Sequence, residues 1–236
     1  ADQAMINKQL ATITPATPLV DFDHRVIMPD GMERWHHWTH RGIFSNDGTL
    51  VEFQATGRDI TRQKLLELKL HDLAIHDHLT GLYNRSYFFH RMERLEQGRR
   101  FPVSVMMLDV DQLKMVNDQY GHAAGDELLN RTARVLAAAF RNEDVIARLG
   151  GDEFGILLPG TDVVACGEAV ARLQQVLDTH NREYAGTPVR FSCGCHTVDQ
   201  GNKLADALSE ADSRMYLEKQ ARMVERYAAR SAATNP

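Results

Sequence analysis

The most informative segment for the fold is Arg-Leu-Gly-Gly-Asp-Glu-Phe at residues 148–154. Apolar runs flank it, Val-Ile-Ala at 145–147 and Phe-Gly-Ile-Leu-Leu at 154–158. Two strand-like runs joined by Gly-Gly predict a β-hairpin. The glycines leave the backbone open to a bulky ligand, and Asp152 and Glu153 are expected to point to opposite faces of the returning strand. By itself the pattern is more typical of a plain solvated turn, and the rest of the chain decides for the hairpin at a site.

Outward from this hairpin, strand-like and helix-like segments alternate. Helices are expected at residues 86–97, 125–140, 163–180 and 204–222, and further strands at 103–108 and 189–193. This order predicts an α/β or α+β sandwich, in which helices cover one sheet.

The strand expected at residues 103–108 leads into Asp109-Val110-Asp111. A buried strand that ends in carboxylates holds them rigidly at a sheet edge, as a cation site requires. A solvated aspartate turn would give the same pattern. A calcium-binding loop is excluded, because the sixth position that requires glycine is Lys114.

Composition limits the function classes. The chain has 236 residues, 43% hydrophobic and 25% charged, which suits one larger or two smaller domains. With 27 basic and 32 acidic residues the net charge is −5, so nucleic-acid binding through a basic surface is not expected. Three cysteines without a Cys-x-x-Cys spacing indicate neither a disulfide framework nor a zinc site. No apolar run reaches the ~20 residues of a membrane span, and no leader is recognised. We therefore expect a cytoplasmic piece without membrane contact, although a longer native chain could be tethered.

The N-terminal region reads as an antiparallel meander. Asp30-Gly31 and Asp47-Gly48 separate extended segments at residues 24–28, 34–44 and 49–57. In the last segment, alternation of apolar and polar residues from Val51 to Thr56 predicts a half-buried strand. His36, His37 and His40 are expected to alternate between the faces of a solvated strand, not to converge on a metal.

A helix is expected from about Thr61 to His76. Leu66, Leu70 and Leu73 follow the helical i, i+4, i+7 pattern. This stripe suits either packing on a neighbouring domain or a short coiled coil, and its place between two domains favours self-pairing.

Two resemblances to known families follow from these residues. The segment 35–60, with Gly42-Ile43, Asp47-Gly48 and Gly57-Arg58, resembles the C-terminal half of a PAS sensor domain. Residues 77–222 resemble a GGDEF-domain diguanylate cyclase. The motifs are Asp77-x-Leu79-Thr80-Gly81-Leu82-x-Asn84-Arg85, Asp109-Val110-Asp111-x-x-Lys114-x-x-Asn117-Asp118-x-x-Gly121-His122-x-x-Gly125-Asp126 and Gly150-Gly151-Asp152-Glu153-Phe154.

The resemblance implies a mostly antiparallel sheet related to the polymerase palm and the nucleotidyl cyclases. It implies that two GTP molecules condense into cyclic di-GMP and two pyrophosphates in a homodimer, and that cyclic di-GMP also inhibits. A cation, Mg²⁺ with Mn²⁺ as an option, would be held by Asp109, the Val110 carbonyl and Asp152. Asp152 or Glu153 would deprotonate the attacking hydroxyl, and Lys114 would neutralise the transition state.

The remaining implied contacts are with GTP and with the product. The GTP-binding residues would be Leu113, Asn117, His122, Asp126, Gly150, Gly151 and Lys219. An aspartate that accepts from guanine N1–H and N2–H₂ would select GTP over ATP. Taken singly, Asn117 also suits a helix cap and Asp126 the N-cap of the next helix. The family usually continues with Gly-Arg soon after the lysine that Lys219 matches, whereas this chain has Arg222 and Met223, so Arg222 is the candidate substitute.

Arg141-x-x-Asp144 stands five residues before Gly150 and matches the product-inhibition motif of the family. Five strand residues span roughly 17 Å, which separates this site from the hairpin turn. The expected organisation is a PAS-like region at 1–60, a connecting helix at 61–76, a GGDEF domain at 77–227 and a tail at 228–236. The alternatives are a non-catalytic module that binds cyclic di-GMP or GTP, and a cyclase-like domain that serves only in dimerisation.

Overall fold

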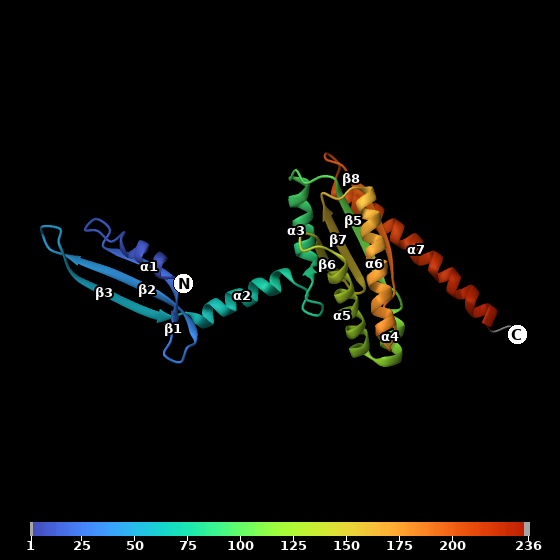
Figure 1. Ribbon diagram of the computed structural model, residues 1–236, viewed down its shortest axis with the longest axis horizontal. Coiled ribbons are helices and arrows are strands. Elements are labelled where there is room, and N and C mark those ends of the chain that lie inside the picture. Colours follow the sequence, from blue (N-terminus) through green and yellow to red (C-terminus); the bar gives the residue numbers. More distant parts are fainter. Residues whose placement is uncertain (1, 234–236) are drawn as a thin grey trace. The chain divides into compact units, whose positions relative to one another are not determined.

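The computed structural model describes the backbone of residues 2–233 and the side chains of residues 2–224. The chain divides into two compact units, with the boundary after Asp72. Each unit has its own β-sheet (Figure 1).

The N-terminal unit is a three-stranded antiparallel sheet in the order β1-β2-β3. Its elements are α1 (Gln3–Leu10), β1 (Leu19–Ile27), β2 (Glu33–Phe44), β3 (Leu50–Asp59) and the start of α2 (Thr61–Ile75). The predicted meander and the helix after it are confirmed. No residue of α2 is buried, and Leu66 and Leu70 are 51% and 66% exposed.

The prediction that the last strand of the meander is half-buried was wrong. Every residue of β3 is exposed, including Val51 and Phe53. Alternation of apolar and polar residues signals a buried face only where another layer covers the sheet. β3 is an edge strand that pairs with β2, while α1 packs on β1 at the opposite edge.

The expectation that the three histidines of β2 lie on a solvated surface is wrong for His40, which is buried, while His36 and His37 are partly exposed. His36, Trp38 and His40 share one face, because residues two apart on a strand point the same way. Their rings stack with each other and with those of Phe22 and His24 on β1. His24 and His40 are buried on this face. His37 points to the opposite face, where its Nδ1 lies 2.8 Å from Asp23.

The C-terminal unit contains a five-stranded sheet in the order β4-β6-β7-β5-β8. β4 runs parallel to β6, and all other pairs are antiparallel. The elements are β4 (Tyr83–Asn84), α3 (Arg85–Glu96), β5 (Val103–Val110), α4 (Leu113–Tyr120), α5 (His122–Ala139), β6 (Val145–Gly150), β7 (Glu153–Pro159), α6 (Val163–Glu183), β8 (Phe191–Val198) and α7 (Leu204–Ala233). This mixed α+β fold confirms the predicted class.

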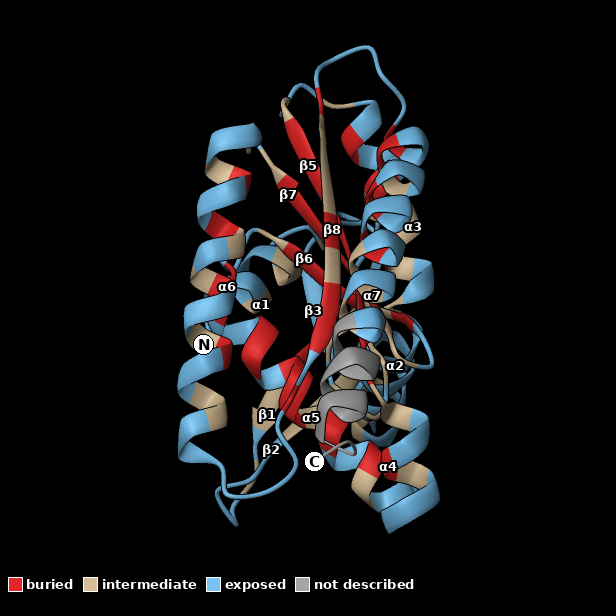
Figure 2. Ribbon diagram, turned by 90° about the vertical axis from the view of Figure 1, so that its right-hand side faces the viewer, coloured by how far each residue is buried: buried red, intermediate tan, exposed pale blue. Residues whose placement is uncertain are grey.

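Two helical layers cover the two faces of this sheet. All eight residues of β5 are buried, and its side chains alternate between the two cores. Val103, Val105 and Met107 pack against α3 and α7, whereas Met106, Leu108 and Val110 pack against α5 and α6. Figure 2 shows the buried residues concentrated along the central strands. A central strand held from both sides gives its last residues a rigid position.

The sequence patterns missed one helix and misplaced two boundaries. α4 is a separate helix between β5 and α5, entered through Gln112 in a left-handed conformation with φ 67°. β8 begins at Phe191 and extends to Val198, so Val189 precedes it. α7 continues to Ala233, past the expected domain end at residue 227.

Candidate active site

The Gly150–Gly151 turn joins β6 to β7, so the predicted hairpin is confirmed. Gly151 has φ +46°, which disfavours any residue with a side chain, and no atom lies within 4 Å of where a Cβ would stand on either glycine. Asp152 belongs to the turn and Glu153 is the first residue of β7, so the two acids are not successive strand residues as expected. The turn therefore presents an open backbone surface beside two half-buried acids.

The end of β5 lies beside this turn. Asp109 pairs in register with Glu153 on β7 and with Ser192 on β8, and it is only 6% exposed. The Val110 N–H donates to the carbonyl oxygen of Asp152 at 2.9 Å, which ties the turn to the tip of β5. The fold thus brings together Asp109, Val110, Asp152 and Glu153, which are about 40 residues apart in the sequence.

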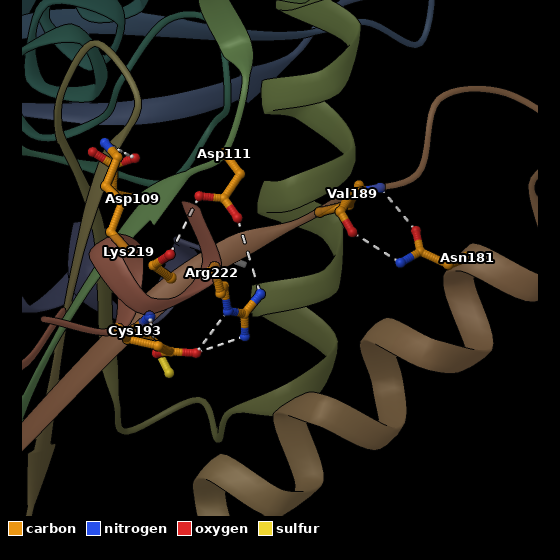
Figure 3. Close-up of polar contacts among 9 residues, drawn as sticks. Asp109, Asp111, Asn181, Val189, Cys193, Lys219 and Arg222 are labelled. Carbon is orange, nitrogen blue, oxygen red and sulfur yellow. Dashed lines mark hydrogen bonds and ion pairs between the residues drawn. The ribbon is translucent and has the colours of Figure 1, made fainter. Parts of the chain in front are cut away.

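Lys219 of α7 completes this carboxylate cluster. Its Nζ donates to Asp109 Oδ1 at 2.7 Å (Figure 3). Burial raises the pKa of Asp109, an effect that the bond from Lys219 offsets only in part and that the charge of Asp152 strengthens. Burial opposes the charge on Lys219, but the hydrogen bond to Asp109 and the negative charges of Asp109, Asp152 and Asp111 together outweigh it and raise the lysine pKa. A buried carboxylate beside like charges favours a cation close by.

A second polar network surrounds Asp111, the other carboxylate at the end of β5, to which the family resemblance gave no role. Asp111 is 6% exposed and accepts from Ser192 Oγ at 3.2 Å, with Arg222 Nη1 at 4.0 Å (Figure 3). Arg222 also binds Glu218 at 2.6 Å, and Glu218 accepts from the N–H of Cys193 at 2.8 Å. The expected substitute arginine is therefore engaged with carboxylates of the protein.

Arg148 connects the glycine turn to the beginning of the unit. Its guanidinium donates twice to the carbonyl of Gly151, at 2.8 and 3.1 Å, and lies 3.3 Å from Asp77. Burial alone would raise the pKa of Asp77, but hydrogen bonds from Thr80 and the charge of Arg148 hold it below its usual range. The Asp77 motif thus has a physical role in fixing the turn, which its sequence position did not reveal.

Helices α4 and α5 carry the residues expected to contact the nucleoside. Leu113 is partly buried against the core, while Lys114, His122 and Asp126 are exposed. Asn117 lies inside α4 and Asp126 lies one turn into α5, so neither is the helix cap considered above. The Oδ1 of Asn117 is buried without a hydrogen-bond partner, 2.0 Å from where a Cβ on Gly125 would stand.

Arg141 and Asp144 form a turn between α5 and β6, at the opposite end of β6 from the glycine pair. The Arg141 N–H donates to Asp144 Oδ2 at 2.8 Å, while the Arg141 side chain is 73% exposed. Burial raises the pKa of Asp144. Glu143 lies 3.8 Å from the Arg141 guanidinium in the same turn. Arg172 of α6, which the sequence did not suggest, also acts on Asp144 and donates to the carbonyl of Ala139.

Among the described residues no group of three or more histidine, cysteine, aspartate or glutamate side chains is arranged to hold a metal ion. The ligand set expected here has only two such side chains, those of Asp109 and Asp152, and a backbone carbonyl, so it is not a group of this size. Within the same part of the chain no helix is both long and apolar enough to span a bilayer.

The match to known families agrees with this geometry. A family model described as "Diguanylate cyclase, GGDEF domain" matches residues 74–224. The chain belongs to this family. The GGDEF assignment therefore holds for the C-terminal unit, whose fold resembles that of solved GGDEF structures.

Individual relatives support the same assignment. "Probable diguanylate cyclase DgcE" of Escherichia coli is 32% identical over 78% of this chain, which spans only 17% of that relative. Diguanylate cyclase SiaD of Pseudomonas aeruginosa, solved with its activator SiaC, superimposes with TM-score 0.59 at 31% identity. The superposition covers 68% of this chain and 64% of the SiaD chain. A microbial GGDEF domain, solved in a study of its interaction with cyclic di-GMP, superimposes with TM-score 0.55 at 31% identity. The superposition covers 64% of this chain and 94% of that domain.

Proposed function

We propose that the C-terminal GGDEF unit condenses two GTP molecules into cyclic di-GMP and two pyrophosphates. The observation that carries the proposal is the buried Asp109 at the tip of β5, opposite Glu153, beside an open Gly-Gly turn and 2.7 Å from Lys219. Carboxylates held at the tip of a rigid sheet beneath an unobstructed backbone suit a nucleoside triphosphate with its cation.

Asp109, the Val110 carbonyl and Asp152 would hold Mg²⁺, and the same oxygens would accept Mn²⁺. Hard oxygen donors fit these ions. Burial beside other acids disfavours the negative charge on Asp109, and a bound cation would stabilise that charge. When bound, the cation neutralises phosphate charge and acidifies a ribose hydroxyl. When substrate and cation bind, the Lys219 ammonium would release Asp109 and bind the triphosphate.

In the reaction, the 3′-oxygen of one GTP forms a bond to the α-phosphorus of the other. The bond from that phosphorus to the bridging oxygen breaks, and pyrophosphate leaves. Asp152 or Glu153 takes the hydroxyl proton, and Lys114, exposed in the first turn of α4, stabilises the developing charge. A second, identical step closes the ring, so two copies of the unit must face each other as a homodimer.

GTP recognition is proposed to use Asn117, His122 and Asp126, with Leu113 against the base. The Oδ1 of Asn117 is buried without a hydrogen-bond partner among the described residues, so a guanine donor that reached it would satisfy it. The exposed Asp126 would accept from guanine N1–H and N2–H₂, donors that adenine does not present together.

Product inhibition is proposed for the turn of Arg141 and Asp144. The exposed Arg141 guanidinium can bind guanine O6 and N7 through two parallel hydrogen bonds. Arg172 lies near Asp144 and would add positive charge for the phosphates. Arg141→Ala should retain turnover and lose inhibition by added cyclic di-GMP, and full inhibition of this variant would contradict the assignment.

For the remaining chain we propose the organisation expected above, with a PAS-like sensor region at 1–60, a signalling helix at 61–76 and the cyclase at 77–227. The three-stranded sheet followed directly by α2 supports it. The exposed leucines of α2 suit self-pairing in the homodimer. Because the proposed substrate is GTP, we place the unit in the cytoplasm.

Purified protein incubated with GTP and Mg²⁺ and followed by chromatography tests the activity. We expect cyclic di-GMP from the unaltered chain and none from Asp152→Ala. Asp178→Ala is the matched control, because Asp178 is an exposed aspartate on α6 that bonds only Gln174 among the described side chains. Cyclic di-GMP binding without any product would overturn the enzyme and favour the non-catalytic module.

A further inference from the structure

Glu218 of α7 binds both the strand β8 and a basic side chain of its own helix. Its Oε2 accepts from the N–H of Cys193 at 2.8 Å. Its Oε1 accepts from Nη2 and Nε of Arg222, at 2.6 and 3.0 Å (Figure 3). Because β8 is an edge strand, it presents backbone N–H groups without a strand partner, and Glu218 supplies the acceptor for one of them.

The backbone of α7 lies directly against β8 one turn before Glu218. A Cβ on Gly194 of β8 would stand 2.3 Å from the backbone nitrogen of Met215, so the two elements approach as closely as a glycine permits. Met215 is also the last buried residue of α7 within the described side chains, which end at residue 224. Apolar packing therefore stops at Met215, and the polar bonds of Glu218, Lys219 and Arg222 hold the next turn to the sheet.

The turn that Glu218 holds carries both basic residues of the site. Lys219 donates to Asp109 at 2.7 Å, and Arg222 Nη1 lies 4.0 Å from Asp111 Oδ2. Residues three positions apart lie on the same side of a helix, so the two cations face the two carboxylates at the end of β5 together. Because Glu218 occupies Nε and Nη2 of Arg222, that pair of donors can bind a phosphate only if Glu218 releases it.

We propose that Glu218 is a positioning residue, which fastens this turn of α7 to β8 and so holds Lys219 where it can bind the triphosphate of GTP. The inference rests on the proposed function, in which Lys219 binds that triphosphate. Loss of the Glu218 carboxylate leaves the Cys193 N–H and Arg222 short of an acceptor, and the turn is then able to move away from β8. Affinity for substrate should suffer more than kcat, because the acids proposed to hold the cation and take the proton lie on β5 and the glycine hairpin.

Steady-state kinetics of the full chain tests this role. Glu218→Ala is expected to raise KM for GTP about tenfold, the effect of weakening one hydrogen bond to a charged group, and to change kcat less than about threefold. The Glu218 side chain is 33% exposed, so its variants should fold. Glu218→Gln keeps an oxygen for the Cys193 N–H and should recover most of the affinity. The matched control is Glu210→Ala, which removes a similar pair with Arg214 at 3.0 Å earlier on α7 and should leave KM unchanged.

Two further measurements do not depend on turnover. Calorimetry with Mg²⁺ and 3′-deoxy-GTP, which lacks the attacking hydroxyl, should show about tenfold weaker binding to Glu218→Ala. The Cys193 amide should exchange its hydrogen at least about tenfold faster in Glu218→Ala, as followed by NMR, and at an unchanged rate in Glu210→Ala. If the unaltered chain binds the analogue but makes no cyclic di-GMP, the proposed activity fails, and the binding to Glu218→Ala still decides this inference. Equal or tighter binding of the analogue by Glu218→Ala, or an unchanged exchange rate at Cys193, would overturn it.

Discussion

Arg148 shows how a single side chain can fix an active-site turn. Its two hydrogen bonds hold the carbonyl of Gly151, and its ion pair with Asp77 is largely shielded, with 14% and 16% of the two side chains exposed. The glycine turn has no side-chain packing of its own, since open space surrounds both glycines. The position of Asp152 therefore depends on a residue that never needs to touch substrate.

Arg148→Ala is expected to lower the free energy of unfolding of the C-terminal unit by about 2–3 kcal/mol, because it leaves Asp77 and the Gly151 carbonyl short of a partner. Turnover should fall with it. Urea unfolding followed by circular dichroism measures the first effect. Arg134→Ala, which removes an exposed pair with Glu127, should cost no more than about 0.5 kcal/mol. Equal losses for the two variants would contradict the role of Arg148.

At the scale of elements, the contact between α4 and α5 places the proposed base-binding side chain. Gly125 allows Asn117 to lie against α5, because a Cβ there would stand 2.0 Å from Asn117 Oδ1. A methyl group cannot be accommodated unless the asparagine moves away. The close approach of α4 and α5 at Asn117 therefore requires glycine at position 125, where a hydrogen stands in place of Cβ.

Gly125→Ala is expected to raise KM for GTP roughly tenfold, the size of one lost hydrogen bond, with a smaller change in kcat. Steady-state kinetics measures both constants. The matched control is Gly167→Ala on α6, where no atom lies within 4 Å of the new Cβ. It should leave KM unchanged and stabilise the helix by about 0.5–1 kcal/mol. An unchanged KM in Gly125→Ala would remove Asn117 from GTP binding.

The stacked rings of β1 and β2 predict a pH dependence for the N-terminal sheet. Burial lowers the pKa of His24 and His40. As the pH falls below about 6.5, the unfolded chain binds protons before the folded sheet does, so stability declines with falling pH. The slope is at most about 1.4 kcal/mol per pH unit for each histidine. Stability is regained as the pH rises above that window.

Both tryptophans of the chain, Trp35 and Trp38, lie in β2, so their fluorescence reports unfolding of this sheet. His40→Phe keeps the ring and removes the titrating nitrogens, and it should flatten the decline between pH 7 and pH 5. The control His71→Gln changes an exposed histidine and should leave the slope as it was. A His40→Phe profile parallel to that of the unaltered chain would contradict this origin.

For the whole molecule, local patterns predicted the elements well and long-range contacts poorly. The hairpin at Gly150 and the buried strand that leads into Asp109 were predictable, because apolar runs and turn residues are signals within a few neighbouring residues. The Arg148–Asp77 pair joins residues 71 positions apart, and no local pattern marks it. Likewise the burial of His40 depends on its neighbours across the sheet, and α4 depends on the unusual backbone of Gln112.

The proposed chemistry needs two copies of the chain, which leads to a prediction about mixtures. Each copy supplies one GTP, so a copy with Asp152→Ala paired with an unaltered one provides both nucleotides but only one competent carboxylate site. Such a mixed dimer is expected to form one of the two phosphodiester bonds and to stop at a linear dinucleotide. Excess Asp152→Ala should therefore suppress cyclic di-GMP formation by a fixed amount of unaltered protein and let the linear product accumulate.

Chromatography across a titration of Asp152→Ala measures both products. At random pairing and equal amounts, one half of all dimers are mixed by simple mass action, so cyclic product per unaltered chain should fall to about half. An Asp178→Ala partner should restore the full yield, because its own site is intact. If cyclic product is unaffected by any excess of Asp152→Ala, the two bonds are made within one copy, and the requirement for a facing partner is wrong.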